Sequence, residues 1–175
     1  MEILLANSFM NLSKASKNRN RLLVALLSFV FVPSIYPQIF TTEEKIKAEQ
    51  GDSVAQYFLY LSYSSGSGIK ADHEEALKWL IKSAEGGFPR AEMVLGTIYA
   101  RGQGLVKNKQ KAFIWYKKAA DKGLSEAQFL LANCFMFGEG TEINEKEAIH
   151  YYELAAKQQY QPAILSLDEI QKTPK

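Results

Sequence analysis

Residues 91–123 read AEMVLGTIYARGQGLVKNKQKAFIWYKKAADKG, and this stretch decides the fold. Ala91 and Leu95 are four residues apart, which places them on one face of a helix. Gly102 follows, and glycine readily adopts the left-handed conformation that ends helices. Asn108 is a preferred N-cap residue and begins a second helix. The stretch therefore predicts two antiparallel helices joined by a Gly-x-Gly turn.

The same pattern recurs along the chain with a period of 36 residues and without an insertion. Small, aromatic and turn positions all stay in register, so chance is a poor explanation. The aligned sets are Ala55, Ala91, Ala127 and Ala163; Leu59, Leu95, Leu131 and Leu167; Ala76, Ala112 and Ala148; Trp79, Trp115 and Tyr151; and Gly66, Gly102 and Gly138.

The repeats predict an all-α solenoid, because one hairpin alone cannot bury both of its faces. Three full units are expected, at residues 55–90, 91–126 and 127–162. Residues 35–54 would form a linker and a partial N-terminal capping helix, and residues 163–175 a C-terminal capping helix and tail.

Helix starts are marked by polar residues. Asp72, Asn108 and Asn144 are expected to cap the second helix of each unit, with their side-chain oxygens accepting from backbone N–H groups. Ser53 and Ser125 are expected to cap first helices in the same manner.

The N-terminal residues 1–34 have the pattern of a signal peptide or an anchor. A basic segment, residues 14–21, precedes the apolar run LLVALLSFVFV at residues 22–32, and Ser34 provides a small residue at the exit. We expect export, to the periplasm or the medium. An uncleaved inner-membrane anchor of residues 22–40 and a buried helix are the alternatives.

These features resemble the Sel1-like repeat, a relative of the tetratricopeptide repeat. The matching segments are AEMVLGTIYARGQGLVKN and AFIWYKKAADKG, and the resemblance covers residues 43–171. Tyr60 and Ala132 replace the family's glycine after leucine, Leu80 replaces its second aromatic residue, and Gln159 replaces its closing glycine. The resemblance implies a right-handed superhelix whose first helices line a concave face, and a role as an adaptor for other proteins.

By similarity with tetratricopeptide grooves, one row of first-helix residues is expected to face the concavity and bind a protein or peptide partner. Aromatic, methionine and arginine side chains in this row are typical of interface cores. The alternative for Met93 and Phe129 is burial between hairpins. The row consists of Tyr57, Leu61, Ser65, Met93, Thr97, Arg101, Phe129, Asn133 and Phe137.

Catalytic and cofactor chemistry finds no support in the sequence. Cys134 is the single cysteine, and His73 and His150 are the two histidines, so neither a clustered metal site nor a Cys–His dyad is indicated. Outside residues 1–34 the chain is close to neutral, and no basic stripe suggests nucleic acid. We therefore predict no cofactor, no metal and no enzymatic activity.

The leading functional hypothesis is an exported adaptor that binds a partner protein in the groove. A narrower version, by family analogy, is a periplasmic immunity protein that neutralises a secreted antibacterial toxin such as a phospholipase. A hydrolase of cell-wall or β-lactam substrates is the third hypothesis, and the absence of a Ser–Lys or Cys–His pair on one helix face counts against it.

Overall fold

The computed structural model describes residues 44–172. The predicted signal or anchor segment lies outside the described residues, as do residues 35–43 of the linker and residues 173–175 of the tail. Within the described part, no helix is long and apolar enough to cross a membrane.

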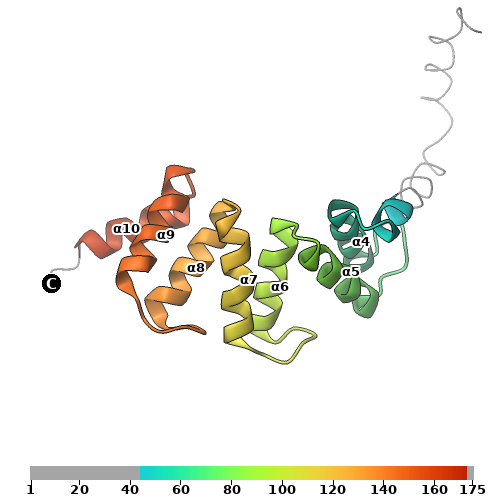
Figure 1. Ribbon diagram of the computed structural model, residues 1–175, viewed down its shortest axis with the longest axis horizontal. Helices are drawn as coiled ribbons and strands as arrows, with labels where there is room; N and C mark the ends of the chain where they lie inside the picture. The colour runs from blue at the N-terminus through green and yellow to red at the C-terminus, as the bar shows by residue number, and fades with distance from the viewer. Residues whose placement is uncertain (1–43, 173–175) are drawn as a thin grey trace, which may run out of the picture. The chain divides into compact units, whose positions relative to one another are not determined.

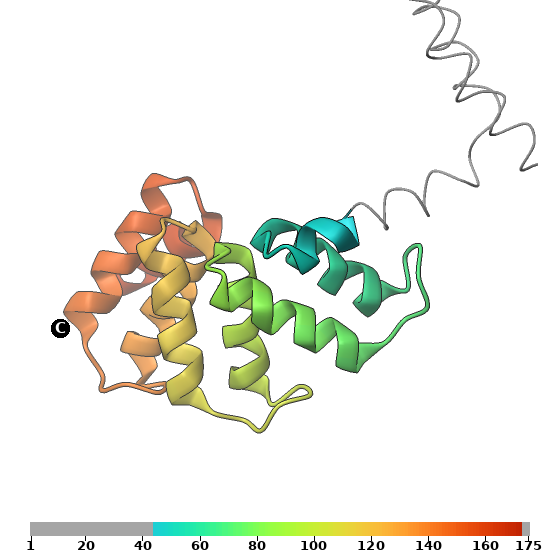
Figure 2. The ribbon, with the colours of Figure 1, turned by 45° about the vertical axis from the view of Figure 1, so that its right-hand side comes forward.

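The described residues form a succession of helices without strands (Figure 1). Residues 44–49 are helical, and seven further helices follow. Within each hairpin the two helices pack together, and each hairpin contacts the next through its second helix (Figures 1 and 2). The predicted solenoid of antiparallel hairpins is confirmed. The helices are α4 (Ser53–Ser65), α5 (His73–Glu85), α6 (Pro89–Arg101), α7 (Lys109–Asp121), α8 (Ser125–Phe137), α9 (Glu145–Lys157) and α10 (Gln161–Lys172).

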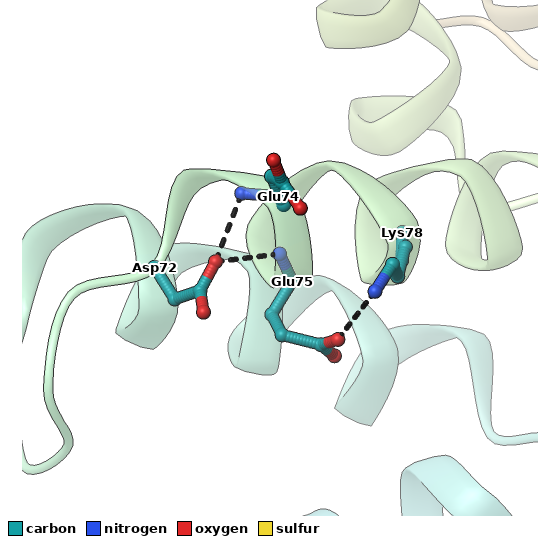
Figure 3. A network of polar contacts seen from close by, with 4 residues as sticks. All are labelled: Asp72, Glu74, Glu75 and Lys78. Atoms are coloured by element: carbon teal, nitrogen blue, oxygen red, sulfur yellow. Dashed lines mark hydrogen bonds and ion pairs between the residues drawn. The ribbon is translucent and has the colours of Figure 1, made fainter.

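The second helices begin as predicted. Asp72 accepts hydrogen bonds from the backbone N–H groups of Glu74 and Glu75, both at 3.0 Å (Figure 3). The Glu75 carboxylate in turn accepts from Lys78, one turn further along α5 (Figure 3). Asn108 caps α7 and Asn144 caps α9 through single side-chain bonds.

The prediction that Ser53 and Ser125 cap first helices is wrong. Each serine is the first residue of its helix, and the N-cap position is the residue before it. Asp52 caps α4 by accepting from the N–H groups of Val54 and Ala55, whereas Leu124 makes no side-chain cap bond. At Leu124 the backbone is fixed by packing, since this side chain is half-buried against the core.

The Gly-x-Gly turns end the first helices as expected. Gly66, Gly102 and Gly138 have φ angles of 73°, 75° and 67°, in the left-handed region. Each also donates its backbone N–H to a carbonyl in the last turn of the preceding helix. The turns thus satisfy part of the hydrogen-bonding capacity that a helix end leaves open.

The core consists of small residues at close contacts and large residues between them. The aligned alanines Ala91, Ala127 and Ala163 are 0% exposed, as are Leu80 and Leu131. Close packing of this kind is sensitive to single methyl groups, because protein interiors have few voids.

At one packing position the bulky residue lies on the second helix in the second hairpin and on the first helix in the first hairpin. A Cβ atom built on Gly96 would lie 2.7 Å from Cδ1 of Tyr116, so the tyrosine ring occupies the space above this glycine. In the first hairpin the large residue is on the first helix, where Tyr60 and the smaller Leu80 share one core cluster. The departures from the family pattern at Tyr60 and Leu80 are therefore compensating changes in side-chain volume.

Candidate interaction surface

The nine residues of the predicted row lie on the first helices α4, α6 and α8, three on each helix. Figure 1 shows where these three helices lie in the fold. Corresponding residues are 36 positions apart, so the row has three levels. Level one consists of Tyr57, Met93 and Phe129. Level two consists of Leu61, Thr97 and Asn133. Level three consists of Ser65, Arg101 and Phe137.

Level one lies at the junctions between hairpins and is half-buried. The Tyr57 ring is 5.1 Å from the ring of Phe88, which immediately precedes α6. The Phe129 ring is 5.5 Å from that of Tyr160, the corresponding residue before α10. Met93 packs against the core cluster between α7 and α8. Each side chain thus helps to join neighbouring hairpins and offers only part of its surface to a partner.

Level two contains two hydrogen bonds between the helices of a hairpin. The Tyr116 hydroxyl donates to Oγ1 of Thr97 at 3.2 Å, and the Tyr152 hydroxyl donates to Oδ1 of Asn133 at 2.5 Å. Burial raises the pKa of both tyrosines, so the phenols remain protonated and able to donate at neutral pH. These bonds orient Thr97 and Asn133.

The first hairpin has no such bond, because Leu80 stands where the other hairpins have tyrosine. Its level-two residue is also apolar, and Leu61 is 41% exposed. The hydroxyl donor and its acceptor are therefore present together in two hairpins and absent together in the first.

Level three is the accessible end of the row. Phe137 is 68% exposed, and Ser65 and Arg101 are also exposed. Ser65 donates its hydroxyl to the carbonyl of Leu61, which occupies its donor within α4. Arg101 and Phe137 consequently offer a guanidinium and an aromatic ring to a partner.

The structure also contains a cleft that the sequence did not predict. Its volume is about 520 Å³, and it lies between the first hairpin and the turn of the second. No single residue of the cleft is unusual in the sequence. A comparison of the repeats could have indicated the cleft, because Leu77 and Gln103 stand where the next repeat has Phe113 and Glu139. The lining includes Tyr60, Ser64, His73, Leu77, Ile98 and Gln103.

Cys134 is a core residue with an unreactive thiol. It is 3% exposed, and burial raises its pKa to about 12, with Glu139 adding to the shift and Lys109 opposing it. At neutral pH the thiol is protonated, and the thiolate is the nucleophilic form. Among residues 44–172, no three His, Cys, Asp or Glu side chains are placed to hold a metal ion.

Comparisons with known proteins agree with the hairpin geometry. The family model of the Sel1 repeat matches three consecutive segments, residues 53–88, 89–124 and 125–160. Each segment is one hairpin, beginning two residues before the corresponding unit drawn from Ala55. A search of curated proteins finds no match.

Solved structures with the same fold come from several bacteria. A Sel1 repeat protein from Oxalobacter formigenes is 37% identical, with a TM-score of 0.72 over 73% of this chain and 96% of that chain. A protective antigen present in uropathogenic Escherichia coli strains is 38% identical, with a TM-score of 0.63 over 67% of this chain and 25% of that chain. Helicobacter pylori cysteine rich protein B shares the fold at 23% identity and a TM-score of 0.58, over 71% of this chain and 92% of that chain.

Sel1 repeat proteins generally mediate protein–protein interactions, and their fold is typically a scaffold without catalytic activity. The three matched segments account for the whole of α4 to α9, and the compensating changes at Tyr60 and Leu80 leave the hairpin intact. The chain belongs to the Sel1 repeat family.

Proposed function

We propose that this chain is an exported adaptor that binds a partner protein or peptide along the first helices α4, α6 and α8. The observation that carries the proposal is the exposure of apolar and cationic side chains at regular spacing on these helices. Phe137 is 68% exposed, Leu61 is 41% exposed, and Arg101 lies at the level of Phe137 one repeat earlier.

The chemistry of the row suits a protein partner. Exposed apolar residues give little benefit to an isolated solenoid, whereas aromatic and arginine side chains contribute much of the binding energy at protein interfaces. Thr97 and Asn133 are held in place by tyrosine hydroxyls, which reduces the entropy lost on binding. The half-buried rings of Tyr57 and Phe129 would form the floor of this surface.

A matched set of variants tests the surface. We expect Phe137→Ser and Arg101→Ala each to weaken binding of a partner identified by crosslinking in the native host by at least tenfold. Ile114→Ser is the control, because Ile114 is 52% exposed but lies on the second helix α7. Equal affinities for all three variants, with unchanged melting temperatures, would contradict the proposed surface.

Export is tested separately. Support for it comes from the basic residues 14–21 followed by the apolar residues 22–32. We expect fractionation to place the protein outside the cytoplasm, and N-terminal sequencing to give a new terminus near residue 34 if the segment is cleaved. Intact protein found only in the cytosol would refute export without affecting the binding surface.

A further inference from the structure

The most informative feature outside the row is the cleft between the first two hairpins. Its volume of about 520 Å³ falls within the range of roughly 300–1,000 Å³ typical of ligand pockets. Leu77 and Ile98 form apolar walls, while His73 and Gln103 contribute polar groups. None of the described residues that line it is acidic.

The next junction along the chain shows how the same place is filled one repeat later. There the ring of Phe113 meets that of Phe135 edge to face, with centroids 5.3 Å apart and planes at 89°. In the preceding repeat the position of Phe113 is taken by Leu77, which lacks a ring. Although Tyr60 lines the cleft, a ring at the position of Phe113 is therefore one component that the cleft lacks.

An ion pair is the second missing component. At the next junction Nζ of Lys109 lies 2.8 Å from Oε1 of Glu139, joining the start of α7 to the turn of the third hairpin. The corresponding residues at the cleft are His73 and Gln103, so the carboxylate is absent. An imidazole and an amide can each donate a hydrogen bond to a carboxylate from elsewhere.

The surroundings of the turn glycines show that the second turn lies further from α5 than the third turn lies from α7. A Cβ atom built on Gly140 would overlap the carbonyl group of Lys109, so the third turn lies directly against α7. A Cβ atom built on Gly104 would have Cδ2 of Leu77 as its nearest neighbour, at 3.8 Å. The second turn thus leaves space beside α5 that the third turn does not leave beside α7.

We propose that this cleft binds an aromatic side chain of a partner polypeptide together with an adjacent Asp or Glu of that partner. The ring takes the place that Phe113 fills at the next junction, against Leu77 and Ile98. The carboxylate takes the place of Glu139 and accepts hydrogen bonds from His73 and Gln103. This inference rests on the proposed role in protein binding, to which it adds a second contact site and a sequence preference.

The direct test is a titration of the full-length chain with the dipeptide acetyl-Phe-Asp-amide. Binding is measured from the changes in backbone amide chemical shifts in NMR spectra of the protein. We expect saturable shifts at Leu77, Gln103 and Gly104. Acetyl-Ala-Asp-amide should bind at least tenfold more weakly, and acetyl-Phe-Asn-amide about threefold more weakly. Shifts confined to the row of Tyr57 and Phe129, or no saturable shifts, would overturn the proposal.

Two variants fill the cleft with residues that other repeats carry at the same positions. Leu77→Phe introduces the ring of Phe113, and Ser64→Met introduces the side chain of Met136. We expect each to weaken dipeptide binding at least tenfold. Leu165→Phe, which adds a ring at a site 60% exposed on α10, should bind as the unaltered chain does.

Having two filling variants keeps the test decisive if one of them fails to fold. Unchanged dipeptide affinity in either folded variant would refute the cleft as the binding site. The two proposals fail separately: loss of the adaptor role would appear as unchanged partner affinity in Phe137→Ser and Arg101→Ala, whereas loss of the cleft site would appear in the dipeptide titration.

Discussion

The first repeat, residues 53–88, and the second, residues 89–124, have the same backbone plan but fill it differently. In the second repeat Tyr116 covers Gly96 and donates to Thr97. In the first repeat the bulk lies on the opposite helix, at Tyr60, and no tyrosine hydroxyl bridges the hairpin; the Ser83 hydroxyl instead donates to the backbone carbonyl of Ser53. The repeat period determines which positions contact each other. The sizes of the side chains at those positions differ from one repeat to the next.

The polar contacts between the start of the first helix and the end of the second helix also differ between the two hairpins. In the second repeat, buried Glu92 pairs with Lys122 at 2.6 Å, and Lys122 also donates to the carbonyl of Gly87. In the first repeat Gly86 takes the place of Lys122, and Oε1 of buried Gln56 has no hydrogen-bond partner among the described residues. Nε1 of Trp79 is also unpaired there, whereas the second repeat leaves only Oε2 of Glu92 unpaired among its described buried side-chain atoms, so the first repeat is the less completely satisfied of the two.

The largest effect is expected from exchanging the bulky residues. Gly96→Tyr should destabilise the fold by about 3 kcal/mol, because its ring would overlap that of Tyr116. Tyr116→Leu should cost about 2 kcal/mol through lost contacts and a lost hydrogen bond. The double variant recreates the pair Tyr60 and Leu80, and urea unfolding should show it at least ~2 kcal/mol more stable than the sum of the single changes.

A matched control separates volume from hydrogen bonding in this exchange. Tyr116→Phe keeps the ring and removes the hydroxyl, so it should cost only about 1 kcal/mol. Strictly additive effects of Gly96→Tyr and Tyr116→Leu would mean that the two positions do not share one space, and the comparison between the repeats would fail.

The next effect concerns the buried carboxylate. Lys122→Ala should destabilise the protein by about 2 kcal/mol, because Glu92 would keep a buried charge without its partner; the half-exposed lysine makes this less than for a fully buried pair. Replacing both residues by Gln imitates Gln128 and Gln158 of the third repeat, which bond at 2.9 Å. Thermal unfolding should place the double Gln variant near the unaltered chain, and a double variant as unstable as Lys122→Ala would contradict this explanation.

The third repeat allows a prediction about alkaline pH. Cys134 stands where the second repeat has Ile98, and burial raises its pKa from 9.0 to about 12. As pH rises past 9 the unfolded chain loses this proton while the folded chain keeps it, so stability falls between pH 9 and pH 12. Cys134→Val should reduce the loss at pH 10 by about 1 kcal/mol. Equal pH profiles for both proteins would show that the tyrosines alone cause the alkaline loss.

The smallest effect is expected at the ends of the second helices. Gly87 and Gly123 have φ angles of 84° and 85°, whereas the corresponding residue of the third repeat, Gln159, has a φ of 62°. A side chain is disfavoured in this left-handed conformation. Gln159→Gly should therefore stabilise the protein by about 0.5 kcal/mol, and Gly123→Gln should destabilise it by about 1 kcal/mol. A destabilising Gln159→Gly would mean that the glutamine makes contacts that offset its strain.

The capping errors show which local signals are unreliable. The caps Asp72, Asn108 and Asn144 are confirmed because each follows a turn that places its side-chain oxygen beside the first N–H groups of the helix. The prediction for Ser53 is wrong because Asp52, one residue earlier, caps α4 with its own side chain, and the prediction for Ser125 is wrong because Leu124 takes the N-cap position without a cap bond and packs against the core. The first-helix row remains a prediction from the sequence, and its division into half-buried, bridged and exposed levels depends on the neighbouring hairpins.

The sequence by itself determined the helices, their turns and their repetition, because periodic apolar residues and glycines act through local backbone preferences. The cleft and the Glu92–Lys122 pair were decided only by tertiary structure. Both depend on side chains about 30 residues apart in the chain, whose distance is set by how closely one hairpin packs on the next. Whether a position is filled, as by Phe113, or left open, as beside Leu77, is a property of the packed pair rather than of either residue.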